Sequence, residues 1–254
     1  MLHDLAGNRR LWRRLVPRLA ERHPLVVADL RGHGESPAPP ADGGYEISAL
    51  AGDCLALLDR LAIDRLCVAG SDLGGAVALE LAVTAPDRIA AIAVSDCTPA
   101  RGWPADDAMV AGFERIEARR LAAAEAGGME AVAESVLDYE APPRVSEDPG
   151  PRRNVIARWT AVSAEGYVGC ARAMRDRPDR TGDLAALAPQ LWLAGELGEM
   201  REAVRRAPEL APGNAQATII RHSGPGCAWQ RPEEWTVAVL DFLAGIGGGD
   251  EAAT

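Results

Sequence analysis

The segment whose residues most suggest chemistry is centred on Asp72, which lies between Gly70-Ser71 and Leu73-Gly74. The apolar run 66–69 predicts a buried strand, and the run 76–82 predicts a helix. A glycine-rich turn between strand and helix is typical of a G-x-nucleophile-x-G elbow, which lifts one side chain above a parallel sheet. Asp72 is therefore a candidate nucleophile or general base. The alternative is that this aspartate only caps the helix that begins after it.

The elements that must position Asp72 alternate between strands and helices. Apolar strands are predicted at 25–28, 66–69, 89–94, 191–194 and 218–221, with helical patterns between them. This alternation predicts a right-handed arrangement of parallel strands covered by helices on both faces. The expected fold class is therefore α/β, with a mostly parallel, doubly covered sheet.

The alternation stops between Asp106 and about Met174, where only helical patterns occur. These patterns are broken at Gly127-Gly128 and again from Pro142-Pro143 to Pro151. A helical insertion between strands predicts a cap over the carboxyl edge of the sheet. The expected domains are 1–100 as the first part of the α/β core, 101–183 as the helical cap, and 184–254 as the second part of the core.

Composition excludes several classes of function. The chain has 254 residues and a formal net charge of −10, which argues against a nucleic-acid partner. No apolar run approaches the roughly 18 residues of a membrane span, and no signal peptide opens the chain. The five cysteines are scattered without metal-ligand spacing, which predicts a cytoplasmic protein with no metal site and no cofactor. Homo-oligomerisation is left open.

Three segments resemble the α/β-hydrolase family over essentially the whole chain: the loop Asp29 to Pro37, the elbow at Asp72, and the closing stretch Arg231 to Leu243. The cap resembles that of the 3-oxoadipate enol-lactonase branch at Gly127–Ala133, Ser163–Tyr167 and Ala173–Asp176. That branch has serine at the elbow. An aspartate there resembles the haloalkane dehalogenases and epoxide hydrolases, in which a carboxylate attacks carbon and forms an ester.

The resemblance also implies two further strands before the one whose tail is Met1-Leu2-His3, and this chain has room for neither. The fold is therefore expected to be N-terminally short. As a consequence, the strand at 25–28 is predicted to be an edge or near-edge strand whose apolar side chains are poorly covered.

The resemblance assigns roles to the residues around the elbow. Asp72 takes the nucleophile position, and the oxyanion hole would use the backbone N–H groups of Leu5 and Leu73. Asp4 stands where the family has glycine and adds a negative charge beside that hole. Asp96, after the strand 89–94, is the expected acid, with loop capping as its alternative.

The base is the position at which the sequence departs furthest from the family. Cys227 stands where the family has histidine, and Gly198 stands where the family's usual acid would be. His222, five residues before Cys227, is the remaining candidate for the base. Without a histidine base, an ester on Asp72 could form but would not be hydrolysed efficiently.

The cap is predicted to roof a pocket whose floor includes Asp72 and the oxyanion-hole residues. Trp103, Trp159 and Tyr167 are the candidate lining side chains, together with Asp4. Large apolar side chains with few polar groups favour a small-molecule ligand. The alternative is that these aromatic side chains only pack the cap.

Two hypotheses on function follow. The first is an atypical enzyme acting on a small, apolar molecule, with Asp72 as nucleophile in hydrolysis or as general base in a lyase, isomerase or cyclase step. The second is a catalytically inactive binding protein that has lost the triad.

If the cap covers Asp72, burial and a neighbouring carboxylate such as Asp96 should raise the Asp72 pKa, because the opposing stabilisation by the helix N-terminus is smaller.

Overall fold

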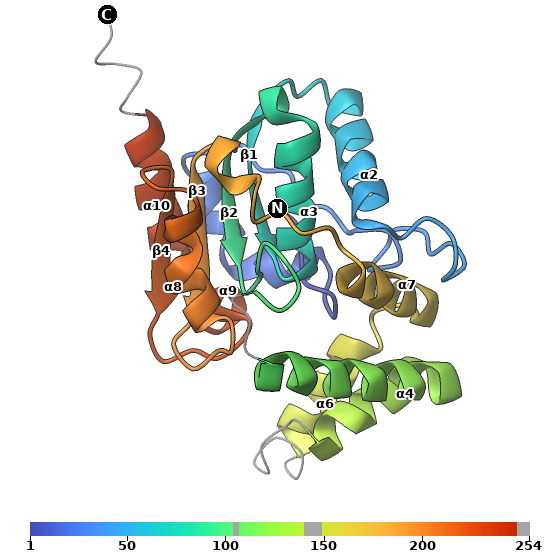
Figure 1. The fold of residues 1–254 in the computed structure, drawn as a ribbon. Helices are drawn as coiled ribbons and strands as arrows, with labels where there is room; N and C mark the ends of the chain where they lie inside the picture. Colours follow the sequence, from blue (N-terminus) through green and yellow to red (C-terminus); the bar gives the residue numbers. More distant parts are fainter. Residues whose placement is uncertain (104–106, 140–148, 248–254) are drawn as a thin grey trace, which may run out of the picture.

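The computed structural model describes residues 1–103, 107–139 and 149–247. Within these residues the centre is a four-stranded parallel sheet with the strand order β1-β2-β3-β4 (Figure 1). The strands are β1 (Leu66–Ser71), β2 (Ile89–Ser95), β3 (Gln190–Gly195) and β4 (Ala215–Ile220). Helices cover both faces of the sheet, so the predicted α/β fold class is confirmed.

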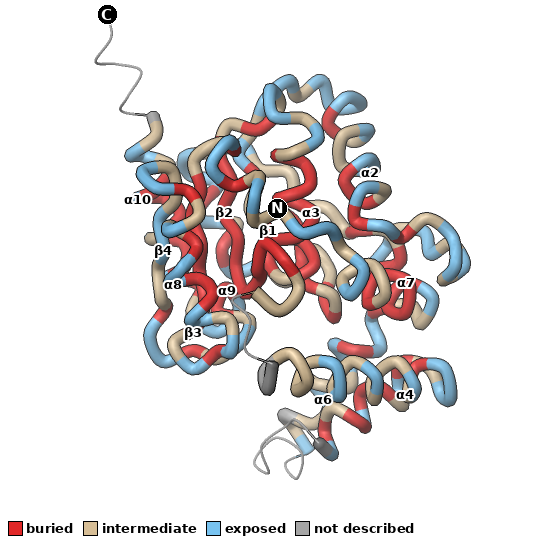
Figure 2. The backbone as a smooth tube through the Cα atoms, viewed as in Figure 1, coloured by how far each residue is buried: buried red, intermediate tan, exposed pale blue. Residues whose placement is uncertain are grey.

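The central strands are buried on both faces, as their continuous apolar runs predict. In β2, Ile92 and Val94 point into one hydrophobic cluster, whereas Ala91 and Ala93 point into another. This alternation follows from the two-residue period of a strand. Figure 2 shows the strands as buried segments between helices whose outer surfaces are exposed.

Each face of the sheet has its own layer of helices. One layer consists of α2 (Ile47–Arg60), α3 (Leu73–Thr84) and α8 (Arg201–Leu210). The other consists of η1 (Arg9–Arg14), α1 (Val16–Ala20), α9 (Cys227–Gln230) and α10 (Pro232–Gly247). Two short 3₁₀ helices, η2 (Pro86–Arg88) and η3 (Leu184–Ala186), lead into β2 and β3.

The segment predicted to form the cap is helical. It contains α4 (Asp107–Tyr139), α6 (Pro149–Trp159) and α7 (Ala164–Arg175). Figure 1 shows α4 and α6 beyond the carboxyl ends of the strands, while α7 packs against α2 and α3. The predicted break at Gly127-Gly128 is a kink inside α4, where Gly128 has a φ of 68°. Of the break predicted from Pro142-Pro143 to Pro151, the part up to residue 148 lies outside the described residues, whereas α6 already begins at Pro149. The division into three domains stays a prediction.

The N-terminal segment joins the sheet through single bridges. Leu2 pairs in parallel with Ala28 on one side and with Gly70 of β1 on the other. The predicted strand at 25–28 is therefore not formed as a strand: in the described part of the chain, its one sheet contact is the bridge between Ala28 and Leu2. The far side of Ala28 is unpaired and residues 25–28 are half-buried, so this segment lies at the predicted edge position. A cavity of about 580 Å³ lies beside this edge, lined by residues 28–31, 36–39 and part of α2.

No helix in the described part of the chain has the length and apolarity needed to cross a membrane.

Candidate active site

The carboxyl ends of β1 and β2 bring the two predicted acidic residues to the same edge of the sheet. The N–H of Asp72 donates to the carbonyl of Ser95 at 2.9 Å, and the N–H of Asp96 donates to the carbonyl of Leu193 at 2.9 Å. Both aspartates have a φ of 49°, in the left-handed region that side chains rarely adopt. Strained backbone of this kind occurs at sites where a side chain must be aimed in one direction.

The elbow requires glycine on both sides of Asp72. A Cβ atom on Gly70 would lie 2.0 Å from the carbonyl oxygen of Gly74, and one on Gly74 would lie 2.2 Å from the carbonyl oxygen of Leu2. Any other residue at these positions would force the backbone apart. The tight strand-to-helix turn predicted from the sequence is therefore present.

The Asp72 side chain does not cap α3, although the residue occupies the N-cap position of this helix. Its Oδ2 atom instead accepts a hydrogen bond from the backbone N–H of Leu5 at 3.1 Å. The N–H of Leu73 also stabilises the charged carboxylate. The two N–H groups predicted to form the oxyanion hole thus act on Asp72 itself. This geometry argues against the alternative in which Asp72 is only a helix cap.

The environment of Asp72 disfavours its charged form. Burial raises the pKa of Asp72 above its ordinary value, and the negative charge of Asp4 raises it further. The Leu5 and Leu73 N–H groups and the Arg177 guanidinium act in the opposite direction but do not cancel the effect. The predicted direction of the shift is confirmed. The carboxylate that contributes to it is Asp4, whereas the sequence pointed to Asp96.

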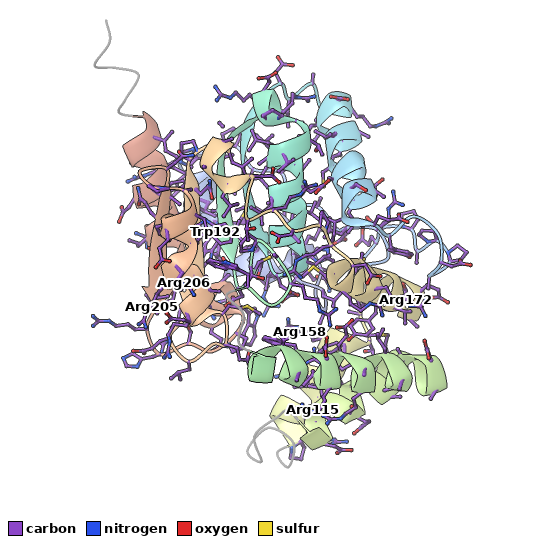
Figure 3. The ribbon with its side chains drawn as sticks, viewed as in Figure 1. Arg115, Arg158, Arg172, Trp192, Arg205 and Arg206 are labelled. Atoms are coloured by element: carbon purple, nitrogen blue, oxygen red, sulfur yellow. The ribbon has the colours of Figure 1, made fainter. Side chains whose placement is uncertain are left out.

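Asp4 lies on the loop that supplies the Leu5 N–H. Its side chain is 8% exposed, and its Oδ2 atom accepts a hydrogen bond from Arg158 Nη2 of α6 at 2.5 Å. The cap and this loop are therefore joined by an ion pair. Figure 3 labels Arg158 in the region between the core and α4.

Asp96 is bound by the segment that leads into α9. Its Oδ2 atom accepts hydrogen bonds from the backbone N–H groups of Gly226 and Cys227, each at 3.0 Å. Burial raises the pKa of Asp96 to about 6, although these N–H groups and the Cys227 thiol oppose the shift. Cys227 is fully buried, and both burial and Asp96 raise the pKa of its thiol. The thiol is therefore a neutral group at physiological pH.

The structure holds the imidazoles of His222, His3 and His33 away from Asp72. The side chain of His222 is 79% exposed and lies 3.9 Å from Glu196. His3 Nε2 accepts the Leu30 N–H at 2.9 Å, and burial lowers the His3 pKa to about 4. Both ring nitrogens of His33 face carbonyl oxygens, those of Arg31 at 3.0 Å and of Leu5 at 2.8 Å. The remaining histidine, His23, lies in the turn after α1.

The predicted aromatic lining residues contact other parts of the protein. Trp159 and Tyr167 are buried and pack edge to face, with ring centroids 5.6 Å apart, inside the hydrophobic cluster of the cap. Trp103 is half-buried, and its ring lies 5.7 Å from the Arg206 guanidinium of α8. These contacts favour the alternative in which Trp159 and Tyr167 pack the cap. The pocket above Asp72 stays a prediction.

Sequence reasoning missed two arginines that act near Asp72. Arg158 binds Asp4, and Arg177 follows α7 and donates to Thr98 Oγ1 at 2.8 Å. Neither belongs to a motif, and the Arg158–Asp4 pair joins residues 154 positions apart in the sequence. Within the described residues, no group of three or more His, Cys, Asp or Glu side chains is placed to hold a metal ion.

Comparisons with known proteins agree with this architecture. Residues 1–124 match the family described as alpha/beta hydrolase fold. Lipase LipV of Mycobacterium tuberculosis is 32% identical over 246 residues, which cover 88% of this chain and 92% of the lipase. Epoxide hydrolase A of the same species is 25% identical over 278 residues, covering 92% of this chain and 86% of the hydrolase.

Among solved structures, the enol-lactonase from Burkholderia xenovorans aligns with a TM-score of 0.79 and 25% identity. The alignment covers 96% of this chain and 89% of the lactonase. These similarities extend over the core and the cap.

Proposed function

Because the chain belongs to the alpha/beta hydrolase fold family, we propose that it is an enzyme acting on a small, largely apolar molecule, with Asp72 as its reactive group. The relatives are hydrolases by name, which supports an enzymatic activity. The arrangement around Asp72 differs from a triad, so the type of reaction has to be argued from this chain's own residues.

The observation that supports the proposal best is a buried carboxylate with a raised pKa and no nearby imidazole among the described contacts. A general base works most efficiently when its pKa lies near the working pH, and burial moves Asp72 in that direction. A nucleophile that forms an ester needs a second base to activate water for hydrolysis. Proton transfer needs no such partner. We therefore favour Asp72 as a general base.

In this reaction the ionised carboxylate of Asp72 removes a proton from a substrate carbon or hydroxyl group. The protonated carboxyl exchanges its hydrogen with solvent and then delivers a proton to another atom of the substrate in an isomerase step, or to a leaving group in a lyase step. Oδ2 of Asp72 is bound by the Leu5 N–H, which fixes the orientation of the carboxylate. The other carboxylate oxygen is the one that would exchange the proton.

A second candidate keeps Asp72 as a nucleophile that displaces halide or opens an epoxide. It is favoured by the similarity to an epoxide hydrolase over most of the chain. In that case the ester on Asp72 would accumulate, because the site offers Cys227 and Asp96 rather than an imidazole for the hydrolytic step.

The test is a panel of small carbonyl compounds, lactones, epoxides and alkyl halides incubated with the wild-type protein in D₂O. We expect solvent deuterium in the substrate or product by NMR, no lasting mass adduct on the protein, and loss of both exchange and turnover in Asp72→Asn. Asp176→Asn, which changes an exposed aspartate paired with Arg175, is the matched control.

Two outcomes would contradict the base mechanism. A stable mass adduct mapped to Asp72 would assign it as the nucleophile. Neither exchange nor adduct, with ligands only raising the melting temperature, would favour a binding protein without catalytic activity.

A further inference from the structure

One side chain of the cap, Arg158, binds both neighbours of Leu5. Arg158 Nη2 donates to Asp4 Oδ2 at 2.5 Å, and Arg158 Nε donates to the carbonyl of Ala6 at 3.3 Å. The residue between these two partners is Leu5, whose N–H donates to Asp72. A guanidinium is suited to this arrangement because its donors are fixed in one plane and can bind two acceptors at once.

The loop that carries Leu5 is short and well bonded on its core side. The N–H of Gly7 donates to the carbonyl of Asp4 at 3.1 Å, which closes a turn around Leu5. The carbonyl of Leu5 faces His33 Nε2 at 2.8 Å, and His33 forms a bridge with Val162, just after α6. The loop is therefore held between the core and the segment that connects α6 to α7.

The Asp4–Arg158 pair is part-buried: the Arg158 side chain is 47% exposed, whereas that of Asp4 is 8% exposed. The Asp4 carboxylate is nine-tenths buried, so removing its partner would leave a charge that water solvates poorly. Surface ion pairs contribute little to stability, but a buried carboxylate bound to one arginine strongly favours the geometry that keeps the two together.

We propose that Arg158 is a positioning residue of the reaction: by binding Asp4 and Ala6, it fixes the Leu5 N–H on Asp72 and so links the placement of the cap to the orientation of the reactive carboxylate. The inference rests on the proposed function only in calling Asp72 reactive, and its structural part can be tested without a substrate. Arg158 itself touches no reacting atom.

The test is an NMR titration of the Leu5 backbone amide, whose chemical shift reports on the charge of Asp72 across the hydrogen bond. The charged and titratable groups that act on Asp72 from neighbouring segments are Asp4, Arg177 and Cys97. The variants are Arg158→Gln, Asp4→Ala and the double variant. Arg172→Gln, which removes an exposed cap arginine paired with Glu125 at 3.2 Å, is the matched control.

We expect the amplitude of the Leu5 titration to fall by about twofold or more in Arg158→Gln and in Asp4→Ala, and the double variant to lose no more than either single variant. Arg172→Gln should behave as the wild type. Arg158→Lys, which keeps the charge but can bind only one partner well, should lie between the wild type and Arg158→Gln.

Three results would overturn the proposal: an unchanged Leu5 titration in Arg158→Gln, additive losses in the double variant, or an equal loss in Arg172→Gln. If Arg158→Gln does not fold, the comparison of Arg158→Lys with Asp4→Ala decides in the same way. Because no substrate is used, a negative result here leaves the deuterium-exchange test of the proposed function untouched, and the reverse also holds.

Discussion

Asp72 and Asp96 are the same residue type at equivalent places, each following a parallel strand with a φ of 49° and each with a raised pKa. They differ in what binds them. Two consecutive N–H groups of the segment that enters α9 hold Oδ2 of Asp96. Oδ2 of Asp72 is held by the N–H of Leu5, on a loop that the cap itself contacts.

This difference separates a structural carboxylate from a candidate reactive one. The partners of Asp96 belong to the segment that enters α9, so this carboxylate holds that segment against the end of β2. The N–H that binds Oδ2 of Asp72 belongs to a loop that Arg158 of the cap contacts. Burial of a carboxylate and a raised pKa are therefore not sufficient to identify the reactive group; the surrounding elements decide.

Replacing each aspartate by asparagine should give the largest contrast. Asp72→Asn should lower turnover of a panel substrate by about 100-fold or more, because a general base typically contributes roughly 10²–10⁴. Asp96→Asn should stay within about 10-fold, since asparagine can still accept an N–H bond. Steady-state rates and solvent deuterium incorporation measure both. Equal losses in the two variants would remove the distinction between the two sites.

For the pH dependence of the unfolding free energy, Asp96 rather than Asp72 should be the informative site. A carboxyl whose pKa rises from 3.8 unfolded to about 6 folded favours the folded state when protonated, and this contribution is lost as the pH rises from about 4 through 6. Asparagine does not ionise, so Asp96→Asn keeps this contribution as the pH rises. At roughly 1.4 kcal/mol per pKa unit, the unfolding free energy of Asp96→Asn should increase by on the order of 3 kcal/mol relative to that of the wild type between pH 4 and 7.

Chemical denaturation of both proteins at several pH values checks this. Burial lowers the pKa of His3 to about 4, so the unfolding free energy also decreases as the pH falls below about 6.5. This decrease is the same in both proteins and does not affect their difference. A constant difference in unfolding free energy across this range would mean that Asp96 does not titrate as described.

The smallest effect should come from His222. Its imidazole is exposed and its contact is Glu196, outside the Asp72 site. We expect His222→Asn to change the rate by less than about twofold and the unfolding free energy by less than about 0.5 kcal/mol, as for other surface substitutions. A large fall in rate would restore His222 as a base and would favour hydrolysis through an ester on Asp72.

Local patterns in the sequence predict most of the fold. Four apolar runs predict β1 to β4, and the glycines around Asp72 predict the elbow, because both depend on short-range sterics. The kink at Gly127-Gly128 was predicted for the same reason. The fifth run, 25–28, joins the sheet by a single bridge at Ala28, because strand pairing depends on the neighbouring segment as well as on the run itself.

The candidate site was predictable only in part. The elbow and the family's pattern pointed to Asp72, Leu5 and Leu73, which lie together. The contribution of Arg158 could not be read, because it depends on an ion pair between segments 154 residues apart and not on local spacing. Trp159 and Tyr167 were expected beside a ligand, yet aromatic side chains in a helix pattern do not reveal whether they face a pocket or each other.

The most direct test of the account is the pKa of the Asp72 carboxyl group, measured by carboxyl-carbon NMR in wild type, Asp4→Asn and Asp96→Asn. We predict a raised pKa in the wild type that falls when the negative charge of Asp4 is removed, with a smaller change in Asp96→Asn. A normal or depressed pKa in the wild type would contradict the general-base mechanism and would leave Asp72 as an ionised nucleophile or as a residue without chemistry.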